Sequence, residues 1–275
     1  VAEPLPMNLS LIALEEPTDG FAGVFTRNRF PGAPVLLGRE RLARPLTRGV
    51  LVNNKISNVC TPRGREDAEE LLDALGGATG TQAGEWFAAS TGIIGWQLPV
   101  PEMRAALPSL VSGLDSSSLL PVARAIMTTD AFPKVRRASA GRASVVGIAK
   151  GAGMIEPNMA TLLCFVCTDA QVDRQRLRET LARCVERTLN RISVDSDQST
   201  SDTVLAFASG RKGPVTDEEL SAAFLTVLGG LAGDIVRNGE GTGHVIRVSV
   251  SGAADESLAA AVGKAVVNSP LVQTA

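Results

Sequence analysis

The residues that are best suited to carry out a chemical reaction lie in one stretch of the chain. The segment Lys150-Gly-Ala-Gly153 predicts a turn, and Pro157-Asn158 ends any regular element. From Thr161 to Val166 the chain becomes apolar and rich in strand-forming residues. A loop is therefore expected to deliver the Ala160–Thr161 peptide bond to the start of a buried strand.

A threonine in that position can do chemistry on its own backbone. Its hydroxyl can attack the carbonyl that precedes it, and breaking the Ala160–Thr161 bond gives Thr161 a free α-amine. The reference pKa of such an amine is about 7.7–8.0, so it can act as the base for the hydroxyl of the same residue. Threonine activated by an N-terminal amine is a known type of nucleophile. The spacing alone favours a simpler interpretation, a turn that enters a core strand.

The amino-acid sequence of this stretch also resembles that of a known family. Lys150-Gly-x-Gly-Met-Ile-x-Pro-Asn-Met-Ala-Thr-Leu-Leu163 resembles the self-cleavage signature of the ornithine acetyltransferases. These are the bifunctional glutamate/ornithine N-acetyltransferases of arginine biosynthesis and their relatives in antibiotic clusters. The resemblance implies an α/β fold of mixed β-sheets with outer helices. It also implies self-cleavage into an α chain (1–160) and a β chain (161–275) that assemble as a heterotetramer.

A second block suits an oxyanion hole. Ser90-Thr-Gly-Ile-Ile-Gly95 follows a predicted strand, and a glycine beside a strand end can present backbone N–H groups to a developing negative charge. A plain strand-to-helix turn would use the same residues. In the family that this block resembles, it supplies the oxyanion hole, and the resemblance assigns that role to Thr91 and Gly92.

Three further places offer groups that could bind an amino acid. Lys150 is a point cation suited to a carboxylate, and Glu240 lies between two glycines, where it could bind an ammonium group or hold a turn. Thr128 and Thr129 could satisfy backbone groups at a helix end. The resemblance implies that all of these residues, together with Thr161, contact substrate.

The function implied is two-step acetyl transfer. Thr161 takes the acetyl group from N-acetylornithine and passes it to glutamate, with no cofactor; acetyl-CoA is an optional second donor in some relatives. One alternative is a hydrolase or amidase of the same fold. Because Asn54–Ser57 departs from the family pattern, a transferase that acts on a modified amino acid in secondary metabolism is another. A third is an unprocessed, inactive relative with a structural or regulatory role.

Composition excludes several other classes. A net charge of −2 and the absence of tyrosine argue against a nucleic-acid surface, and neither a basic leader nor a membrane-length apolar run is evident. We therefore expect a cytoplasmic protein without a membrane partner. The four cysteines are interpreted as core residues, with Cys164 and Cys167 on opposite faces of a strand. No metal site is expected, and the aspartates of 193–203 are expected to form a hydrogen-bonded loop near the site.

Periodicity predicts the elements that position these groups. Residues 8–14 and 22–28 read as strands that could form a hairpin. Further strands are predicted at 51–54, 86–89, 144–149, 161–166, 204–208 and 244–250. Helices are predicted at 65–75, 101–111, 121–130, 173–192, 216–236 and 254–267. Relatives continue beyond residue 275 into a block that returns to the active site, so we expect this list of site residues to be incomplete.

Overall fold

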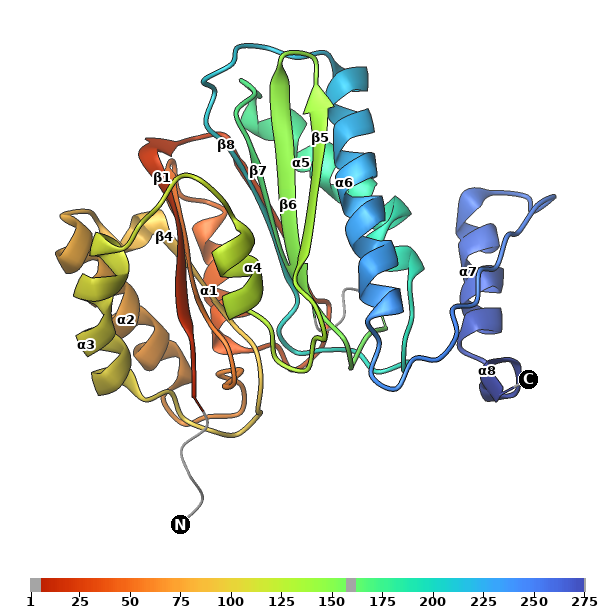
Figure 1. Cartoon of the computed structure of the whole chain (residues 1–275), viewed down its shortest axis with the longest axis horizontal. Helices are drawn as coiled ribbons and strands as arrows, with labels where there is room; N and C mark the ends of the chain where they lie inside the picture. Colours follow the sequence, from red (N-terminus) through yellow and green to blue (C-terminus); the bar gives the residue numbers. More distant parts are fainter. Residues whose placement is uncertain (1–5, 157–161, 275) are drawn as a thin grey trace.

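The computed structural model of the chain describes residues 6–156 and 162–274, and it contains two mixed β-sheets (Figure 1). The smaller has the strand order β1-β3-β4, with β1 antiparallel and β4 parallel to β3. Its strands are β1 (Leu9–Thr18), β3 (Thr47–Asn53) and β4 (Trp86–Ser90). The larger has the order β2-β8-β7-β6-β5, in which only β7 and β8 are parallel. Its strands are β2 (Phe21–Phe25), β5 (Lys134–Ala140), β6 (Ala143–Lys150), β7 (Leu163–Thr168) and β8 (Thr203–Ala208).

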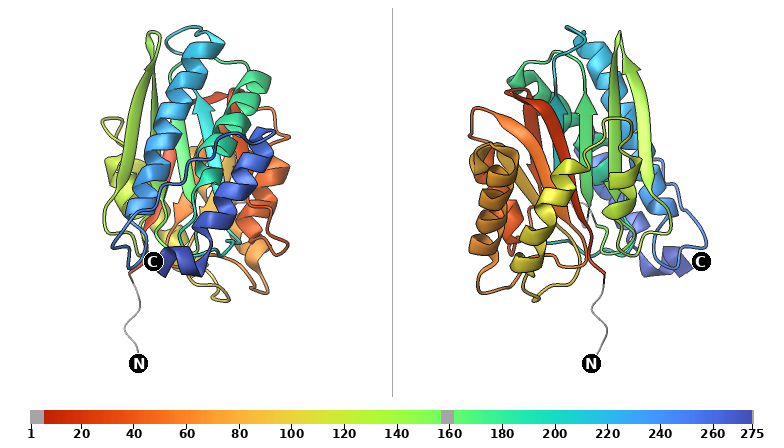
Figure 2. Two further views of the ribbon diagram at one scale, coloured as in Figure 1. Left: turned by 90° about the vertical axis from the view of Figure 1, so that its right-hand side faces the viewer. Right: turned by 60° about the vertical axis from the view of Figure 1, so that its left-hand side comes forward.

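Four helices cover the outer faces of the two sheets. Helices α2 and α3 lie outside the three-stranded sheet, and α5 and α6 lie outside the five-stranded sheet (Figures 1 and 2). The helices are α1 (Ala33–Arg41), α2 (Gly64–Thr79), α3 (Val100–Ser112), α4 (Leu120–Ala125), α5 (Arg174–Arg187), α6 (Asp217–Arg237), α7 (Glu256–Val267) and α8 (Pro270–Thr274), with short 3-10 turns at Ala83–Glu85 and Leu189–Arg191. The predicted α/β class, with mixed sheets and outer helices, is confirmed.

Three apolar cores separate these layers. The central one lies between the sheets, where the ring of Phe87 meets those of Phe21 and Phe207 edge-on at 5.8 and 6.4 Å between centroids. A second core lies under α5 and α6, and a third under α2 and α3. The strands β6, β7 and β8 contribute to both cores beside the five-stranded sheet, so their alternate residues are buried on both faces. Cys164 packs in the α5/α6 core and Cys167 against the central one, which confirms their opposite orientation.

Helix α6 is the best predicted element. Thr216 and Glu219 form the expected capping box, and the whole inward stripe is buried. By length and composition α6 could cross a membrane, and it is the one such helix in the described part of the chain. Half of its most apolar stretch is buried inside the protein, however, as in a core helix.

Several predicted boundaries and pairings are wrong. The predicted hairpin of β1 with β2 does not form, because the chain passes from one sheet to the other after Gly20 and β2 pairs with β8. Helix α2 does not stop at Gly76 but ends at Gly80, whose φ of +68° suits a C-cap. Gly76 is needed for another reason, because a side chain there would collide with the carbonyl of Thr81. Cys60 is exposed and is not a core residue.

Other elements were missed or do not form. Strand β5 is at the edge of its sheet and carries charged residues, so its sequence lacks the expected alternation. Helix α1 begins at Ala33, and the residue before it, Gly32, provides no side-chain cap. The predicted strand 244–250 has no strand neighbour among the described residues, and its side chains Val245 and Ile246 are exposed. Alternation alone does not make a strand without a partner.

Candidate active site

The candidate site lies at the connection between β6 and β7. These strands are antiparallel neighbours, and Lys150 at the end of β6 pairs with Leu163 at the start of β7. Residues 157–161 lie outside the described part of the chain, and with them Ala160, Thr161 and the bond between them. The segments on either side of this gap are described and are held in place by identifiable contacts.

One polar loop fixes both sides of the connection. The carboxylate of Asp195 accepts hydrogen bonds from the backbone N–H groups of Met154 and Ile155, the latter at 2.6 Å. On the other side, Asp202 Oδ1 accepts a hydrogen bond from the N–H of Leu162 at 2.7 Å. The prediction that residues 193–203 form a hydrogen-bonded loop near the site is therefore confirmed.

Asp202 is an unusual acid because it is fully buried. Burial raises its pKa well above the ordinary value, although the hydrogen bond from Leu162 and the charge of Lys150 oppose this rise. Its second oxygen, Oδ2, has no hydrogen-bond partner among the described residues. The loop thus holds a protonatable group immediately beside the backbone that follows Thr161 in the sequence.

A cluster of buried charges surrounds the end of β6. Lys134 Nζ lies 2.6 Å from Asp130 Oδ1, and neither side chain is exposed to solvent. Lys150 is buried nearby, and burial lowers its pKa; the negative charge of Asp130 opposes this effect and the positive charge of Lys134 adds to it. For Asp130 burial would raise the pKa, but Lys150 and Lys134 outweigh it, so the pKa lies below its usual value.

Glu240 joins this cluster from the loop after α6. Its Oε1 accepts a hydrogen bond from the hydroxyl of Thr129 at 2.5 Å, and its N–H donates to the carbonyl of Ala152 at 2.8 Å. A side chain on Gly153 would approach the Glu240 carboxyl carbon to 2.7 Å, so the glycine makes room for this carboxylate. The structure therefore brings together Thr128–Thr129, Lys150 and Glu240, which are far apart in sequence.

Thr91 and Gly92 lie on a separate set of loops. The Thr91 N–H donates to the carbonyl of Asn53 at 3.2 Å. Gly92 has a φ of +129°, and a side chain there would come within 2.1 Å of the backbone carbon of Lys55. Within residues 6–156 and 162–274 no group accepts a hydrogen bond from the Gly92 N–H. Among these described residues it is a backbone donor without an acceptor, as an oxyanion hole requires.

A buried asparagine connects the two groups. The Asn54 side-chain amide donates to the carbonyls of Ala125 and Met127, at 2.9 Å each, and so ties the loop beside Gly92 to the segment that leads into Thr128. No hydrogen bond in the described parts of the chain joins Thr91 or Gly92 directly to Lys150 or Glu240. Asn54 belongs to the segment that departs from the family pattern.

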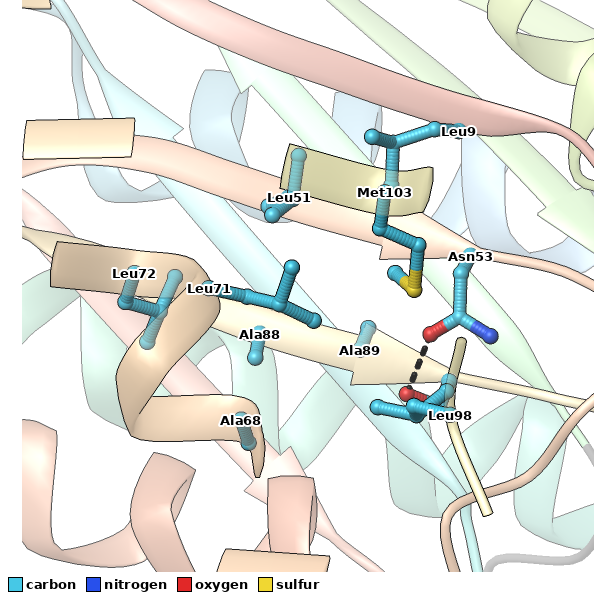
Figure 3. Close-up of a pocket in the computed structure, with 11 residues that line it drawn as sticks. Leu9, Leu51, Asn53, Ala68, Leu71, Leu72, Ala88, Ala89, Leu98 and Met103 are labelled. Carbon is cyan, nitrogen blue, oxygen red and sulfur yellow. Dashed lines mark hydrogen bonds between the residues drawn. The ribbon is translucent and has the colours of Figure 1, made fainter. Parts of the chain in front are cut away.

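The cavity drawn in Figure 3 is not part of this site. It lies between the three-stranded sheet and helices α2 and α3, and apolar side chains such as Leu72 and Met103 line most of it. Its volume is about 10 Å³, which is barely enough for one water molecule. At one end the Ser90 hydroxyl donates to Asn53 Oδ1 at 2.6 Å, which fixes the strand ends that lead into Thr91 and Asn54.

Comparison with known proteins decides the family. Residues 4–275 match the model of the ArgJ family. The chain belongs to the ArgJ family. It is 46% identical over 255 residues to glutamate N-acetyltransferase Oat2 of Streptomyces clavuligerus, which covers 92% of this chain and 65% of that protein. It is 45% identical over 278 residues to the arginine biosynthesis bifunctional protein ArgJ of Nitratidesulfovibrio vulgaris, which covers 98% of this chain and 70% of that protein.

A solved structure in this group is ornithine acetyltransferase of Mycobacterium tuberculosis complexed with ornithine. It is 31% identical to this chain, with a TM-score of 0.49 over 57% of this chain and 84% of that one. The chain spans about two thirds of the length of the curated ArgJ relatives that it matches, 65% in the case of Oat2.

In this ArgJ-family chain, sequence reasoning predicted the loop that contains Asp202 but missed how single buried residues connect the site. Asp130, Lys134, Asp202 and Asn54 are all buried and polar, and each contacts a backbone or side-chain group of a segment that carries a predicted site residue. One signal was available. Asp130 and Lys134 bracket the apolar pair Phe132-Pro133 four residues apart, beside the threonines that the sequence had already singled out.

Proposed function

We propose that this protein is an acetyltransferase that cleaves itself between Ala160 and Thr161 and then moves an acetyl group from N-acetylornithine to glutamate through an acetyl-Thr161 intermediate. The observation that carries the proposal is the hydrogen bond from the Glu240 N–H to the carbonyl of Ala152, which places Glu240 against the chain that leads from Lys150 toward Thr161. Lys150 and Glu240 supply one positive and one negative charge, and a free amino acid presents the complement of both.

The pairing of the strands supports self-cleavage without loss of the fold. The five-stranded sheet takes β2, β6 and β5 from residues before the cleavage point, and β7 and β8 from residues after it. The ladders β6–β7 and β2–β8 would therefore join the α chain (1–160) to the β chain (161–275) after the peptide bond is broken. Both product chains also contribute to the central core, so cleavage leaves the buried surface intact.

The proposed chemistry assigns one task to each group. The Thr161 α-amine removes the proton from its own hydroxyl, which attacks the acetyl carbonyl. The N–H of Gly92 and the hydroxyl of Thr91 stabilise the tetrahedral oxyanion, an effect typically worth roughly 2.7–4 kcal/mol per donor. Lys150 binds the substrate carboxylate, and Glu240, held by Thr129, binds the amino group. Ornithine then leaves, and the glutamate amine collects the acetyl group.

The proposal also includes the location, the pathway and the assembly of the protein. The protein works in the cytoplasm in arginine biosynthesis, its α and β chains assemble as a heterotetramer, and acetyl-CoA serves as an optional second acetyl donor. The identity to relatives named as arginine biosynthesis proteins supports this placement.

Two measurements test the proposal. Mass spectrometry of the denatured protein should show two fragments that divide before Thr161. With N-acetylornithine labelled in its acetyl group, the label should appear in N-acetylglutamate when glutamate is present. Release of the label as free acetate instead would indicate the hydrolase, and one intact chain without transfer would indicate the inactive relative.

The nucleophile is tested by a matched pair of variants. Thr161→Ala should leave the chain intact and abolish transfer, because it removes the hydroxyl. Thr161→Ser keeps a hydroxyl and should retain both cleavage and transfer, at reduced rates. Transfer by Thr161→Ala at the rate of the natural protein would contradict the assignment.

A further inference from the structure

Asp130 contacts more of the site than any single predicted binding residue does. Its Oδ1 accepts hydrogen bonds from Lys134 Nζ at 2.6 Å and from the N–H of Gly151 at 2.8 Å, while Oδ2 accepts one from the N–H of Thr128 at 3.1 Å. One carboxylate thus joins the threonine segment, the start of β5 and the turn that follows Lys150. Next to it, the Ala131 N–H donates to Asn238 Oδ1 at 3.0 Å, which brings in the loop that carries Glu240.

Lys134, the partner of Asp130, is also fully buried. The Lys134 side chain has no exposed surface, its ammonium lies 5.2 Å from the centre of the Phe132 ring, and its backbone pairs with Ala149, the neighbour of Lys150. Burying both charges costs several kcal/mol per ion unless their hydrogen bonds are complete, so such a pair is rarely explained by stability alone. Its position beside a third buried charge points to a task in the site.

We propose that Asp130 and Lys134 are a positioning pair for the reaction. Asp130 holds the segments of Thr128 and Lys150 in register, and the two opposite charges together set the ionisation of Lys150, the group that binds the substrate carboxylate. The pair touches no reacting atom. The proposal rests on the proposed function in one respect, namely that Lys150 binds the carboxylate of an amino acid.

The charges around Lys150 fix the direction of each expected effect. Asp130, Asp202 and Glu240 favour its charged form, whereas Lys134 and burial disfavour it. Neutralising Asp130 removes an attraction, so the pKa of Lys150 falls further. Neutralising Lys134 removes a repulsion, so the pKa of Lys150 rises. Because a lysine loses its charge as the pH rises through its pKa, the pH range in which carboxylate binds shifts with it.

The test compares Asp130→Asn with Lys134→Met. In both, kcat/KM for acetyl transfer is measured against pH, and the alkaline limb should lie at lower pH in Asp130→Asn and at higher pH in Lys134→Met. We expect each displacement to be roughly 0.5–1 pH unit, the usual scale of environmental shifts. The change should lie mainly in KM, because the pair acts on binding and not on Thr161.

A merely structural ion pair predicts a different result. Substituting either residue would then break the same contact, so both variants would lose activity. The alkaline limbs of their pH profiles would stay in place or move in the same direction. That result would overturn the proposal. Since each single variant leaves a buried charge unpaired and could unfold, Asp130→Asn/Lys134→Met is made as well. With neither member of the pair left facing an uncharged partner it should fold, and its alkaline limb should lie between those of the single variants.

A second readout does not depend on activity. Nuclear magnetic resonance titration of 13Cε-labelled lysine, with Lys150 assigned by its loss in Lys150→Met, reports the ionisation of Lys150 directly. Opposite displacements in the two single variants support the pair even if the protein transfers no acetyl group, in which case only the proposed function fails. If the natural protein transfers acetyl groups but Lys150 titrates at the same pH in both single variants, the positioning role of the pair is refuted and the proposed function is not.

Discussion

The two sides of the candidate site are held in place by different kinds of interaction. On the side of the three-stranded sheet, Thr91 and Gly92 are placed by main-chain hydrogen bonds and by the close approach of Gly92 to the backbone of Lys55. On the side of the five-stranded sheet, buried ionised groups do the placing, with Asp130 and Lys134 at the centre. One side depends on shape and the other on charge.

This difference teaches how each side should respond to change. A backbone donor has no titratable group, so the oxyanion side should be insensitive to pH and sensitive to an added methyl group. The charged side should tolerate changes of shape that keep hydrogen bonds, and respond to any change of charge or pH. The predictions below set these responses against each other.

The largest effect is expected from Gly92→Ala. The φ of +129° is unfavourable for alanine, and the new Cβ would meet the Lys55 carbonyl carbon at 2.1 Å, so the loop that carries the donor must move. Losing one oxyanion donor typically reduces kcat by about 100- to 1000-fold. Steady-state transfer kinetics measure the loss, which should be the same at every pH.

Gly95→Ala is the matched control for that variant. Gly95 also has a positive φ, of +85°, but nothing lies within 4 Å of an added Cβ. It should cost about 1–2 kcal/mol of stability from backbone strain, with kcat changed only a few-fold. If the two variants lose kcat equally, collision at Gly92 is not what positions the donor.

An intermediate effect is expected at Asp202, measured as the free energy of unfolding. Asp202→Ala leaves the Leu162 N–H without an acceptor, which should cost about 1–3 kcal/mol. Asp202→Asn keeps an amide oxygen for that N–H. It should be at least as stable as the natural protein at neutral pH, because it removes a buried group that is costly to ionise.

The pH dependence separates these two variants further. The pKa of Asp202 is raised in the folded protein, so folding favours its protonated form and the natural protein should lose stability as the pH rises above the ordinary value of 3.8. Asp202→Asn should lack this loss. Denaturant unfolding between pH 4 and 8 measures it, and parallel curves for the two proteins would contradict the assigned direction.

The sequence predicted those parts of the molecule in which one pattern had one physical meaning. The stripe of α6 and the capping box at Thr216 could only face a core, and they do. The alternating segment 244–250 has an equally clear pattern, but a strand needs a neighbour and it has none in the described part of the chain. Local periodicity shows which face is apolar, not what covers it.

The candidate site divides in the same way. Thr128, Thr129, Lys150 and Glu240 could be named from the family that their motifs resemble, and the fold brings them together, with a direct hydrogen bond from Thr129 to Glu240. The roles of Asp130 and Lys134 could not, because a buried charge is recognisable only when its surroundings are known, and the turn after Lys150 that Asp130 contacts is distant in sequence. The nucleophile itself, Thr161, stays a prediction.

The smallest effect is expected from Glu240→Gln. Glutamine keeps an oxygen for the Thr129 hydroxyl but removes the charge that we assign to the substrate amino group. Glu240 is exposed, so solvent weakens its attraction, and KM for N-acetylornithine should rise by roughly fivefold, the upper end for an exposed ion pair, with kcat almost unchanged. The difference from the natural protein should shrink as salt is added. Glu218→Gln, an exposed carboxylate in the first turn of α6, is the control and should change neither constant. A fall in kcat in Glu240→Gln that salt does not alter would place Glu240 with the shape-dependent side of the site.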